Sequence, residues 1–194
     1  MVQKIAEAVL VEPGHRIIEI GPGTGLLTEK LLERCNDVVA VELDQRAVEV
    51  LSEKFPKLRV IHKDVLETDF QELSIGKEKT HAVGNLPYYI TSQILFLLLE
   101  NRSYMADALL MMQKEVAERI VADIRTKDYG ILSVQTQLMS TPEILFDVPR
   151  QVFSPQPNVN SAMVRLTFDK GALACNDQEL KTVVRTAFNQ RRKN

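Results

Sequence analysis

Short apolar runs alternate with segments of helical periodicity along the first two thirds of this 194-residue chain. Five largely apolar runs are too short for typical helices and predict buried strands: 15–20, 37–43, 58–64, 80–85 and 106–113. Four other segments have apolar residues at helical spacing: 25–35, 44–55, 91–100 and 114–124. Asp44 and Thr91 are the predicted N-caps of two of these helices. The alternation predicts an α/β fold with a doubly wound, Rossmann-like sheet and helices on both faces.

The last third of the chain has a different pattern. Residues 143–149 and 160–168 predict two strands without a full helix between them, which favours an antiparallel, hairpin-like end to a sheet of about seven strands. The Pro-rich segment between them, "FSPQPNVNS" at 153–161, is predicted to be extended. A final helix is predicted from an apolar stripe formed by Leu180, Val183, Val184, Ala187 and Phe188.

Composition and charge narrow the class of protein. Hydrophobic residues make up 45% of the chain, enough for a sizeable core in one domain. The net charge of −2 gives no general basic field of the kind that strong nucleic-acid binders often show. Only the C-terminal end is basic, through Lys181, Arg185, Arg191, Arg192 and Lys193.

The cysteines and histidines do not predict a metal centre. Cys35 and Cys175 are far apart and form no CxxC motif, which favours a reducing cytoplasm over a disulfide framework. Three isolated histidines lack metal-ligand spacing: His15, His62 and His81. The longest apolar run, 94–99, is too short to span a bilayer. We therefore expect a cytoplasmic protein with no metal and no membrane contact.

A glycine-rich stretch, "EIGPGTGLLT" at 19–28, follows the first predicted strand and opens the first predicted helix. Gly21, Gly23 and Gly25 allow the backbone to turn tightly and to approach a ligand closely. Their GxGxG spacing differs from the GxGxxG of dinucleotide-binding folds, so the loop alone is weak evidence for any one cofactor.

Three carboxylates lie at the carboxyl ends of three successive predicted strands, and they narrow the choice of cofactor. Glu42 is placed to accept hydrogen bonds from ribose hydroxyls, and Asp64 from an adenine amino group. Glu19 favours a cationic part of the ligand. Leu43 and Val65, the residues after Glu42 and Asp64, are assigned to the same cofactor site. The set suits a cofactor with a ribose, an adenine and a positive charge, and suits a pyrophosphate badly; each acid alone is compatible with a solvated strand end.

The sequence "NLPYY" at 85–89 places a polar residue and a proline where the fourth strand ends. Asn85 offers a neutral acceptor oxygen that cannot remove a proton at neutral pH. Pro87 fixes a turn that directs the Leu86 carbonyl outward, and Tyr88 supplies a flat face. Two acceptors and an aromatic ring could hold an exocyclic amino group for attack on a methyl donor, by positioning and electrostatics. The alternative is a plain strand-to-helix turn with buried tyrosines.

Six stretches resemble the ribosomal RNA adenine dimethyltransferase family, which includes KsgA- or RsmA-like enzymes and Erm resistance methyltransferases. They occur in the family's order and span nearly the whole chain: "EIGPGTGLLT", "VELD", "HKDVL", "GNLPYYITSQIL", "QKEVAERI" and "VFSPQPNVNSAMVRL". NLPY alone is typical of amino-directed methyltransferases, and its combination with FxPxPxVxS is far more specific. Residues 89–100 and 129–137 are more similar to KsgA than to Erm.

The resemblance implies an enzyme that uses S-adenosylmethionine and no metal. Its expected substrate is N6 of two adjacent adenosines in the 3′-terminal hairpin of small-subunit (16S) rRNA within an immature 30S particle. The expected product is N6,N6-dimethyladenosine, with a role in ribosome assembly, and the expected state is a monomer. The resemblance further implies that the three glycines approach the cofactor's methionine part, that Glu42 holds its ribose and Asp64 its adenine. It places Asn85, Leu86 and Tyr88 at the target base, with Phe153 stacked on the other side.

The chain departs from the family at both ends. Family members begin with an arm that contains a GQ(N/H)FL motif, and they continue after "FNQRRK" into a helical domain. This chain begins at "MVQKIAEAV" and stops at "NQRRKN". We therefore expect a methyltransferase domain at 1–170 and a helix at 171–194 that leads to a missing domain. Such a core is expected to bind cofactor weakly and to methylate rRNA poorly or not at all.

Three other functions stay open at this point. A nicotinamide oxidoreductase is disfavoured by the glycine spacing and by the NLPY sequence. A non-enzymatic ribosome-assembly factor on a methyltransferase scaffold would have the same residues. An Erm-type enzyme would act on large-subunit rRNA instead.

Overall fold

The computed structural model describes residues 1–171, 173 and 175–190. Their centre is one sheet of seven strands in the order β3-β2-β1-β4-β5-β7-β6. The strands are β1 (Arg16–Ile20), β2 (Val38–Glu42), β3 (Arg59–His62), β4 (Thr80–Asn85), β5 (Asp107–Gln113), β6 (Thr141–Val148) and β7 (Ser161–Thr167). The pairs among β1 to β5 are parallel, and β7 runs antiparallel to both β5 and β6. The predicted seven-stranded sheet with an antiparallel end is confirmed.

Eight α-helices connect or flank these strands in the described residues: α1 (Val2–Glu7), α2 (Leu26–Leu32), α3 (Gln45–Lys54), α4 (Phe70–Ser74), α5 (Thr91–Glu100), α6 (Lys114–Ile120), α7 (Ile131–Met139) and α8 (Asp177–Gln190). Short 3-10 turns are η1 (Val65–Glu67), η2 (Arg102–Tyr104) and η3 (Arg150–Val152). The helices α1, α4 and α7 were not predicted.

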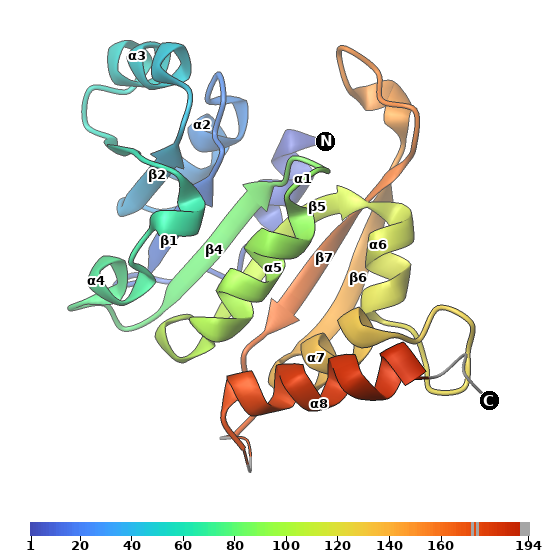
Figure 1. Cartoon of the computed structure of the whole chain (residues 1–194). Coiled ribbons are helices and arrows are strands. Elements are labelled where there is room, and N and C mark those ends of the chain that lie inside the picture. The colour runs from blue at the N-terminus through green and yellow to red at the C-terminus, as the bar shows by residue number, and fades with distance from the viewer. Residues whose placement is uncertain (172, 174, 191–194) are drawn as a thin grey trace.

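Alternate residues of the central strands point to opposite faces of the sheet, and each face has its own apolar core. Ile18 and Ile20 belong to the larger core, which α4, α5, α6, α7 and α8 cover. Ile17 belongs to the second core, which α1 and α2 cover. Figure 1 shows α5, α6 and α8 in front of the sheet and α1 behind it. Helices therefore lie on both faces, as expected.

The strand order places one particular junction at the centre of the sheet. From β1 the chain continues outward to β2 and β3, whereas β4 and β5 lie on the other side of β1. Ligands of open α/β sheets bind at such a reversal, outside the carboxyl ends of the strands. Here Ile20 pairs with Gly84, so the loop after β1 lies beside the end of β4. A Cβ at Gly84 would come within 3.0 Å of the Ile20 carbonyl, which explains a glycine at this close approach.

Two local expectations need correction. Thr91 does not cap α5: Ile90 holds the cap position, and the Thr91 hydroxyl donates to the Pro87 carbonyl at 3.0 Å. The segment 153–161 is not fully extended, because it follows η3 with a series of bends. The loop 149–160 nevertheless projects beyond the sheet on the side where β4 and β5 end (Figure 1). Asp44 caps α3 as predicted, accepting from the Arg46 N–H at 2.8 Å.

The predicted apolar stripe of the last helix is narrower than expected. Leu180 and Val184 are buried and Phe188 is half-buried, but Val183 and Ala187 are exposed. The division at residue 170 into a methyltransferase domain and a C-terminal helix stays a prediction. Three of the basic residues at the C-terminal end lie outside the described residues: Arg191, Arg192 and Lys193.

Candidate active site

The glycine loop after β1 adopts a backbone conformation that side chains rarely allow. Gly21, Gly23 and Gly25 have φ values of 64°, 56° and 78°. At Gly25, which starts α2, a Cβ would also come within 2.6 Å of the Phe55 ring. At Gly21 and Gly23 a Cβ would meet nothing within 4 Å, because these residues face open space. The loop therefore presents bare backbone toward a cavity.

Glu42, at the end of β2, holds this loop in place. Its Oε2 accepts from the Gly23 N–H at 3.1 Å, and its Oε1 accepts from the Leu43 N–H at 2.8 Å and the Asp44 N–H at 2.9 Å. A carboxylate has about four lone-pair sites, so roughly one acceptor position is left for a ligand. Asp64 similarly uses only Oδ1, which accepts from the Leu66 N–H at 2.9 Å as η1 begins.

Glu19, near the end of β1, has a buried carboxyl group that is not fully satisfied by hydrogen bonds among the described residues. Its side chain is 1% exposed, and Oε2 has no hydrogen-bond partner in the described structure. Desolvation raises the pKa of Glu19 to about 7; the nearby Thr28 hydroxyl opposes this shift and the charge of Glu42 adds to it. The Thr28 hydroxyl makes no hydrogen bond of normal geometry. A buried carboxylate without a donor is costly, and a cationic ligand would relieve that cost.

Three cavities follow one another along the carboxyl ends of the strands. The first, of about 340 Å³, is lined by Glu19, Gly21, Gly23, Asn85 and Phe153. The second, of about 330 Å³, is lined by Gly21, Glu42, Leu43, Asp64, Val65 and Pro87. The third, of about 310 Å³, is lined by Asn85, Leu86, Pro87, Tyr88 and Phe153. Because neighbouring cavities share residues, they form one crevice, and every predicted site residue except Gly25 lines it.

The wall between the first and third cavities is the NLPY turn. Within the described part of the chain, neither the Asn85 side-chain amide nor the Leu86 carbonyl has a hydrogen-bond partner. The Leu86 side chain is buried, and its N–H donates to the Met111 carbonyl at 3.0 Å. The Tyr88 hydroxyl lies 2.9 Å from Ser161 Oγ, which fixes the ring to the start of β7. Two residues with free acceptors and one with a fixed ring thus line the same cavity.

A plain turn with buried tyrosines is not what the structure shows. Tyr88 is 36% exposed and Tyr89 is 85% exposed. Phe153, on the loop between β6 and β7, is half-buried and lines both the first and the third cavity. The loop thus brings an aromatic ring to the crevice from a distant part of the sequence.

Some residues of the crevice were missed by sequence reasoning. Met1, Val2 and Ile5, from the start of the chain and α1, line the first cavity. Tyr89 lines the second. Helix α1 is too short to show a clear periodicity, and Tyr89 has no feature in sequence that separates it from Tyr88.

The opposite, amino end of the sheet contains a buried cluster that sequence spacing did not reveal. His81 Nδ1 lies 2.8 Å from Asp107 Oδ1, and His81 Nε2 lies 2.9 Å from His15 Nδ1. The Glu12 N–H donates to His15 Nδ1 at 3.2 Å. All three side chains are nearly fully buried. The polar groups of this cluster therefore satisfy one another.

A second cluster at the amino end is centred on Asp37. Arg16 donates to Asp37 Oδ1 at 2.9 Å and Oδ2 at 3.1 Å, and also to the Leu73 carbonyl at 2.6 Å. Lys77 forms a further ion pair with Asp37. Burial alone would raise the pKa of Asp37, but the hydrogen bonds from Arg16 and Lys77 lower it below its usual value.

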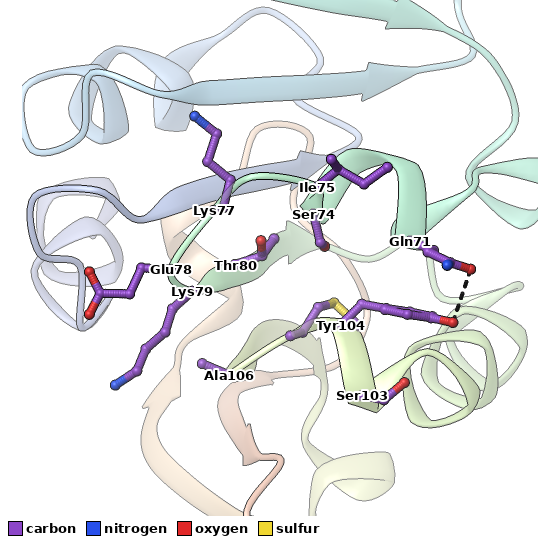
Figure 2. A pocket seen from close by; sticks show the side chains of 11 residues that line it. Gln71, Ser74, Ile75, Lys77, Glu78, Lys79, Thr80, Ser103, Tyr104 and Ala106 are labelled. Carbon is purple, nitrogen blue, oxygen red and sulfur yellow. Dashed lines mark hydrogen bonds between the residues drawn. The ribbon is translucent and has the colours of Figure 1, made fainter.

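The cavity beside this cluster, shown in Figure 2, has a volume of about 490 Å³. Tyr104 on its wall donates to Gln71 Oε1 at 3.0 Å. Lys77, although it lines the cavity, is already paired with Asp37. None of the predicted site residues lines this cavity, so its size alone does not make it the active site.

Two further observations concern the described residues only. No helix in them is long and apolar enough to cross a membrane. In the same ranges, no group of three or more His, Cys, Asp or Glu side chains is arranged to hold a metal ion.

The strand order, the glycine loop after β1 and the crevice at the strand ends define the Rossmann-like fold of the S-adenosylmethionine-dependent methyltransferases. Within that class, the chain belongs to the ribosomal RNA adenine dimethylase family, whose model matches residues 1–194.

Known proteins of this kind are similar to the chain in sequence and in structure. Ribosomal RNA small subunit methyltransferase A of Salinibacter ruber is 50% identical over 196 residues, covering 100% of this chain and 66% of that protein. A dimethyladenosine transferase from Plasmodium falciparum has a TM-score of 0.85 at 31% identity, covering 98% of this chain and 69% of the other. The 23S rRNA methyltransferase ErmE has a TM-score of 0.77 at 31% identity, covering 100% and 78%. This chain thus spans just under two thirds of the length of its Salinibacter relative.

Proposed function

We propose that this chain transfers methyl groups from S-adenosylmethionine to N6 of two adjacent adenosines in the 3′-terminal hairpin of small-subunit rRNA. The product is N6,N6-dimethyladenosine, formed within an immature 30S particle. The single observation that supports this most is the pair of free acceptors, Asn85 and Leu86, in the third cavity, which shares Asn85 with the first. The Salinibacter relative, at 50% identity, is named as a small-subunit rRNA methyltransferase, which favours that subunit over the 23S target of ErmE.

The residues of the first two cavities fit the proposed cofactor. The unpartnered Glu19 Oε2 offers an ionic partner for the ammonium of the methionine part. Gly21 and Gly23 leave room for that part to lie against the backbone. Glu42 has an acceptor position left for a ribose hydroxyl, and Asp64 Oδ2 is free for the adenine amino group. Leu43 and Val65 supply the apolar sides of the adenine site.

The third cavity fits a target adenine. Its exocyclic amino group has two N–H donors, and the Asn85 side-chain oxygen and the Leu86 carbonyl are two acceptors without partners. Acceptance of both N–H bonds favours tetrahedral geometry at N6 and turns the nitrogen lone pair toward the first cavity. When bound there, S-adenosylmethionine supplies the electrophilic methyl group. Asn85 is neutral, so its contribution is positioning and electrostatic stabilisation.

Tyr88 and Phe153 are proposed to hold the two faces of that adenine. Both line the third cavity, and the Tyr88 ring is fixed through Ser161. A base that leaves its helix loses its stacking, and an aromatic pocket replaces it. We further propose that the protein acts as a cytoplasmic monomer with a role in small-subunit assembly. In this proposal residues 1–170 form the methyltransferase domain, and residues 171–194 lead into the remainder of the longer relatives.

The test is methyl transfer from labelled S-adenosylmethionine to immature small subunits and, in parallel, to protein-free large-subunit rRNA. Residues 1–194 and a form extended at both ends to the length of the relatives are assayed side by side. We expect the extended form to place two methyl groups on each of two adjacent small-subunit adenosines, as read by mass spectrometry. Label only in large-subunit rRNA, or none with the extended form, would refute the proposal. Calorimetric titration with a nicotinamide dinucleotide is the matched control for cofactor class.

A further inference from the structure

Tyr89 is an exposed aromatic ring at the rim of the crevice. In the described residues three Tyr or Phe side chains are exposed, and Tyr89 at 85% exceeds Tyr88 and Tyr104, both at 36%. Tyr88 and Tyr104 have hydrogen-bonded hydroxyls, whereas the Tyr89 hydroxyl has no partner among the described residues. Nothing in the fold of this part of the chain therefore explains a tyrosine at position 89.

The backbone beneath Tyr89 is held firmly. The Pro87 carbonyl accepts from the Ile90 N–H at 3.2 Å and from the Thr91 hydroxyl at 3.0 Å. These two hydrogen bonds close the turn that contains Tyr89. Proline at position 87 fixes φ at the start of the turn. A ring on a rigid turn loses little backbone entropy when a ligand stacks on it.

The position of Tyr89 is next to the proposed base site but outside it. Tyr88 lines the third cavity with Asn85, whereas Tyr89 lines the second cavity with Ile90; Pro87 lines both. The third cavity, of about 310 Å³, is shaped by the residues that would hold one adenine. If two adjacent adenosines are modified in turn, the second must lie close by while the first is held.

We propose that Tyr89 is the stacking platform for the nucleobase adjacent to the target adenosine. This inference rests on the proposed function and names a specificity-determining residue for it. A base and a phenol ring stack without regard to base identity, and such contacts supply affinity where phosphate attraction is weak, as for this chain of net charge −2. The competing occupant is the adenine of the cofactor, because Leu43 and Val65 line the same cavity as Tyr89.

The experiment measures RNA affinity and cofactor affinity separately. The form extended to the length of the relatives binds a small-subunit hairpin that contains two adjacent adenosines, in the presence of S-adenosylhomocysteine, and fluorescence anisotropy gives the Kd. The same hairpin is made with either adenine base removed. The variants are Tyr89→Ala, Tyr89→Phe and Tyr104→Ala, the last being the control at the amino end of the sheet.

We expect Tyr89→Ala to raise the RNA Kd about 5- to 150-fold, the loss of one base–aromatic stack. Tyr89→Phe and Tyr104→Ala should stay near the wild-type RNA Kd. In calorimetry, Tyr89→Ala should change the Kd for S-adenosylhomocysteine much less than it changes the RNA Kd. Removal of the neighbouring base should weaken wild-type binding by a similar factor and should add no further loss in Tyr89→Ala.

Two results would overturn the proposal. One is a raised cofactor Kd with an unchanged RNA Kd in Tyr89→Ala, which would assign Tyr89 to the cofactor's adenine. The other is full additivity of the two losses in RNA affinity, from Tyr89→Ala and from removal of the neighbouring base. Additive losses would show that Tyr89 and that base do not touch. Absence of methyl transfer by the wild-type protein would instead refute the proposed function, so the two failures are distinguishable.

Discussion

At the amino end of the sheet, Arg16 donates to both oxygens of Asp37, and His81 lies between Asp107 and His15. At the carboxyl end, Glu19 Oε2 is buried without a partner, and in the described structure the Asn85 side chain also lacks one. The two ends belong to the same strands: His81 and Asn85 are both on β4. One strand therefore contributes a satisfied polar group at its start and an unsatisfied one at its end.

The difference shows that the two ends of the sheet affect the stability of the fold in opposite directions. Paired buried groups at the amino end hold neighbouring strands together, whereas the buried, unpaired oxygen of Glu19 at the carboxyl end costs free energy until a ligand binds. Thr80 is an exception, because its buried hydroxyl at the start of β4 also lacks a partner in the described structure. A hydroxyl costs less to bury than a carboxylate, so the contrast between the two ends holds.

The largest effect is expected from breaking the amino end. His81→Ala leaves the Asp107 carboxylate buried without its partner and should lower the free energy of unfolding by about 3–5 kcal/mol. Urea denaturation measures the loss, and methyl transfer per folded molecule should change little. Asp107→Asn, which keeps an acceptor oxygen, is the matched control and should lose less. Equal stability of His81→Ala and wild type would show that this cluster does not hold the strands.

At the carboxyl end the corresponding change should affect chemistry instead of stability. Asn85→Ala removes one of the two amino-group acceptors and should cost about 2–4 kcal/mol of transition-state stabilisation, seen as a lower kcat. The Kd for S-adenosylmethionine should stay near wild type, because Asn85 is proposed to face the base. If cofactor binding and methylation fall together, the assigned role is wrong.

Glu19 allows the cost at the carboxyl end to be measured directly. Its pKa is raised from 4.5 to about 7 in the folded chain, so the unfolded state loses its proton first and stability falls as the pH rises through this window. Glu19→Gln cannot ionise. Its advantage over wild type in the free energy of unfolding should therefore grow by up to about 3 kcal/mol between pH 4 and pH 8.

The same variant tests the proposed cofactor contact. Ionised Glu19 favours a cationic ligand. As the pH increases toward 7, wild-type affinity for S-adenosylmethionine should therefore increase by up to about tenfold per pH unit, and above pH 7 it should level off. Calorimetry across this range should show a flat profile for Glu19→Gln. Parallel profiles for the two proteins would separate Glu19 from the cofactor.

The smallest effect is expected at Phe153. Phe153→Leu keeps most of the apolar volume, so the free energy of unfolding should fall by less than about 1.5 kcal/mol. RNA-dependent turnover should fall by a factor that corresponds to about 1–3 kcal/mol, because a stacking face for the base is lost. Chemical denaturation and steady-state kinetics separate the two. A large stability loss with normal turnover per folded molecule would assign Phe153 to the second core instead.

The strands and the crevice could be predicted because their evidence is local in the sequence. Each strand is a short apolar run, and four polar residues lie at or near the carboxyl end of one of them: Glu19, Glu42, Asp64 and Asn85. Since carboxyl ends of parallel strands meet at one edge, strand order in the sequence was sufficient to group them.

Other features depend on contacts that no local pattern encodes. His15, His81 and Asp107 are far apart in sequence and meet only because β1, β4 and β5 are neighbours in the sheet. Helix α7 is half-polar along its length and lacked a clear stripe. Tyr88 and Tyr89 differ because one side chain reaches Ser161 on β7 and the other does not, which depends on tertiary structure.

The antiparallel β7 has a consequence for how such proteins diverge. Val148 pairs with Ser161, so the loop 149–160 leaves and re-enters the sheet at one place (Figure 1). Its length and sequence can change during evolution, or by design, without disturbing strand order or the glycine loop. Phe153 belongs to this loop, whereas Asn85 belongs to β4. A change of this hairpin tip would thus alter the surroundings of Phe153 and leave the crevice residues on β1, β2 and β4 in place.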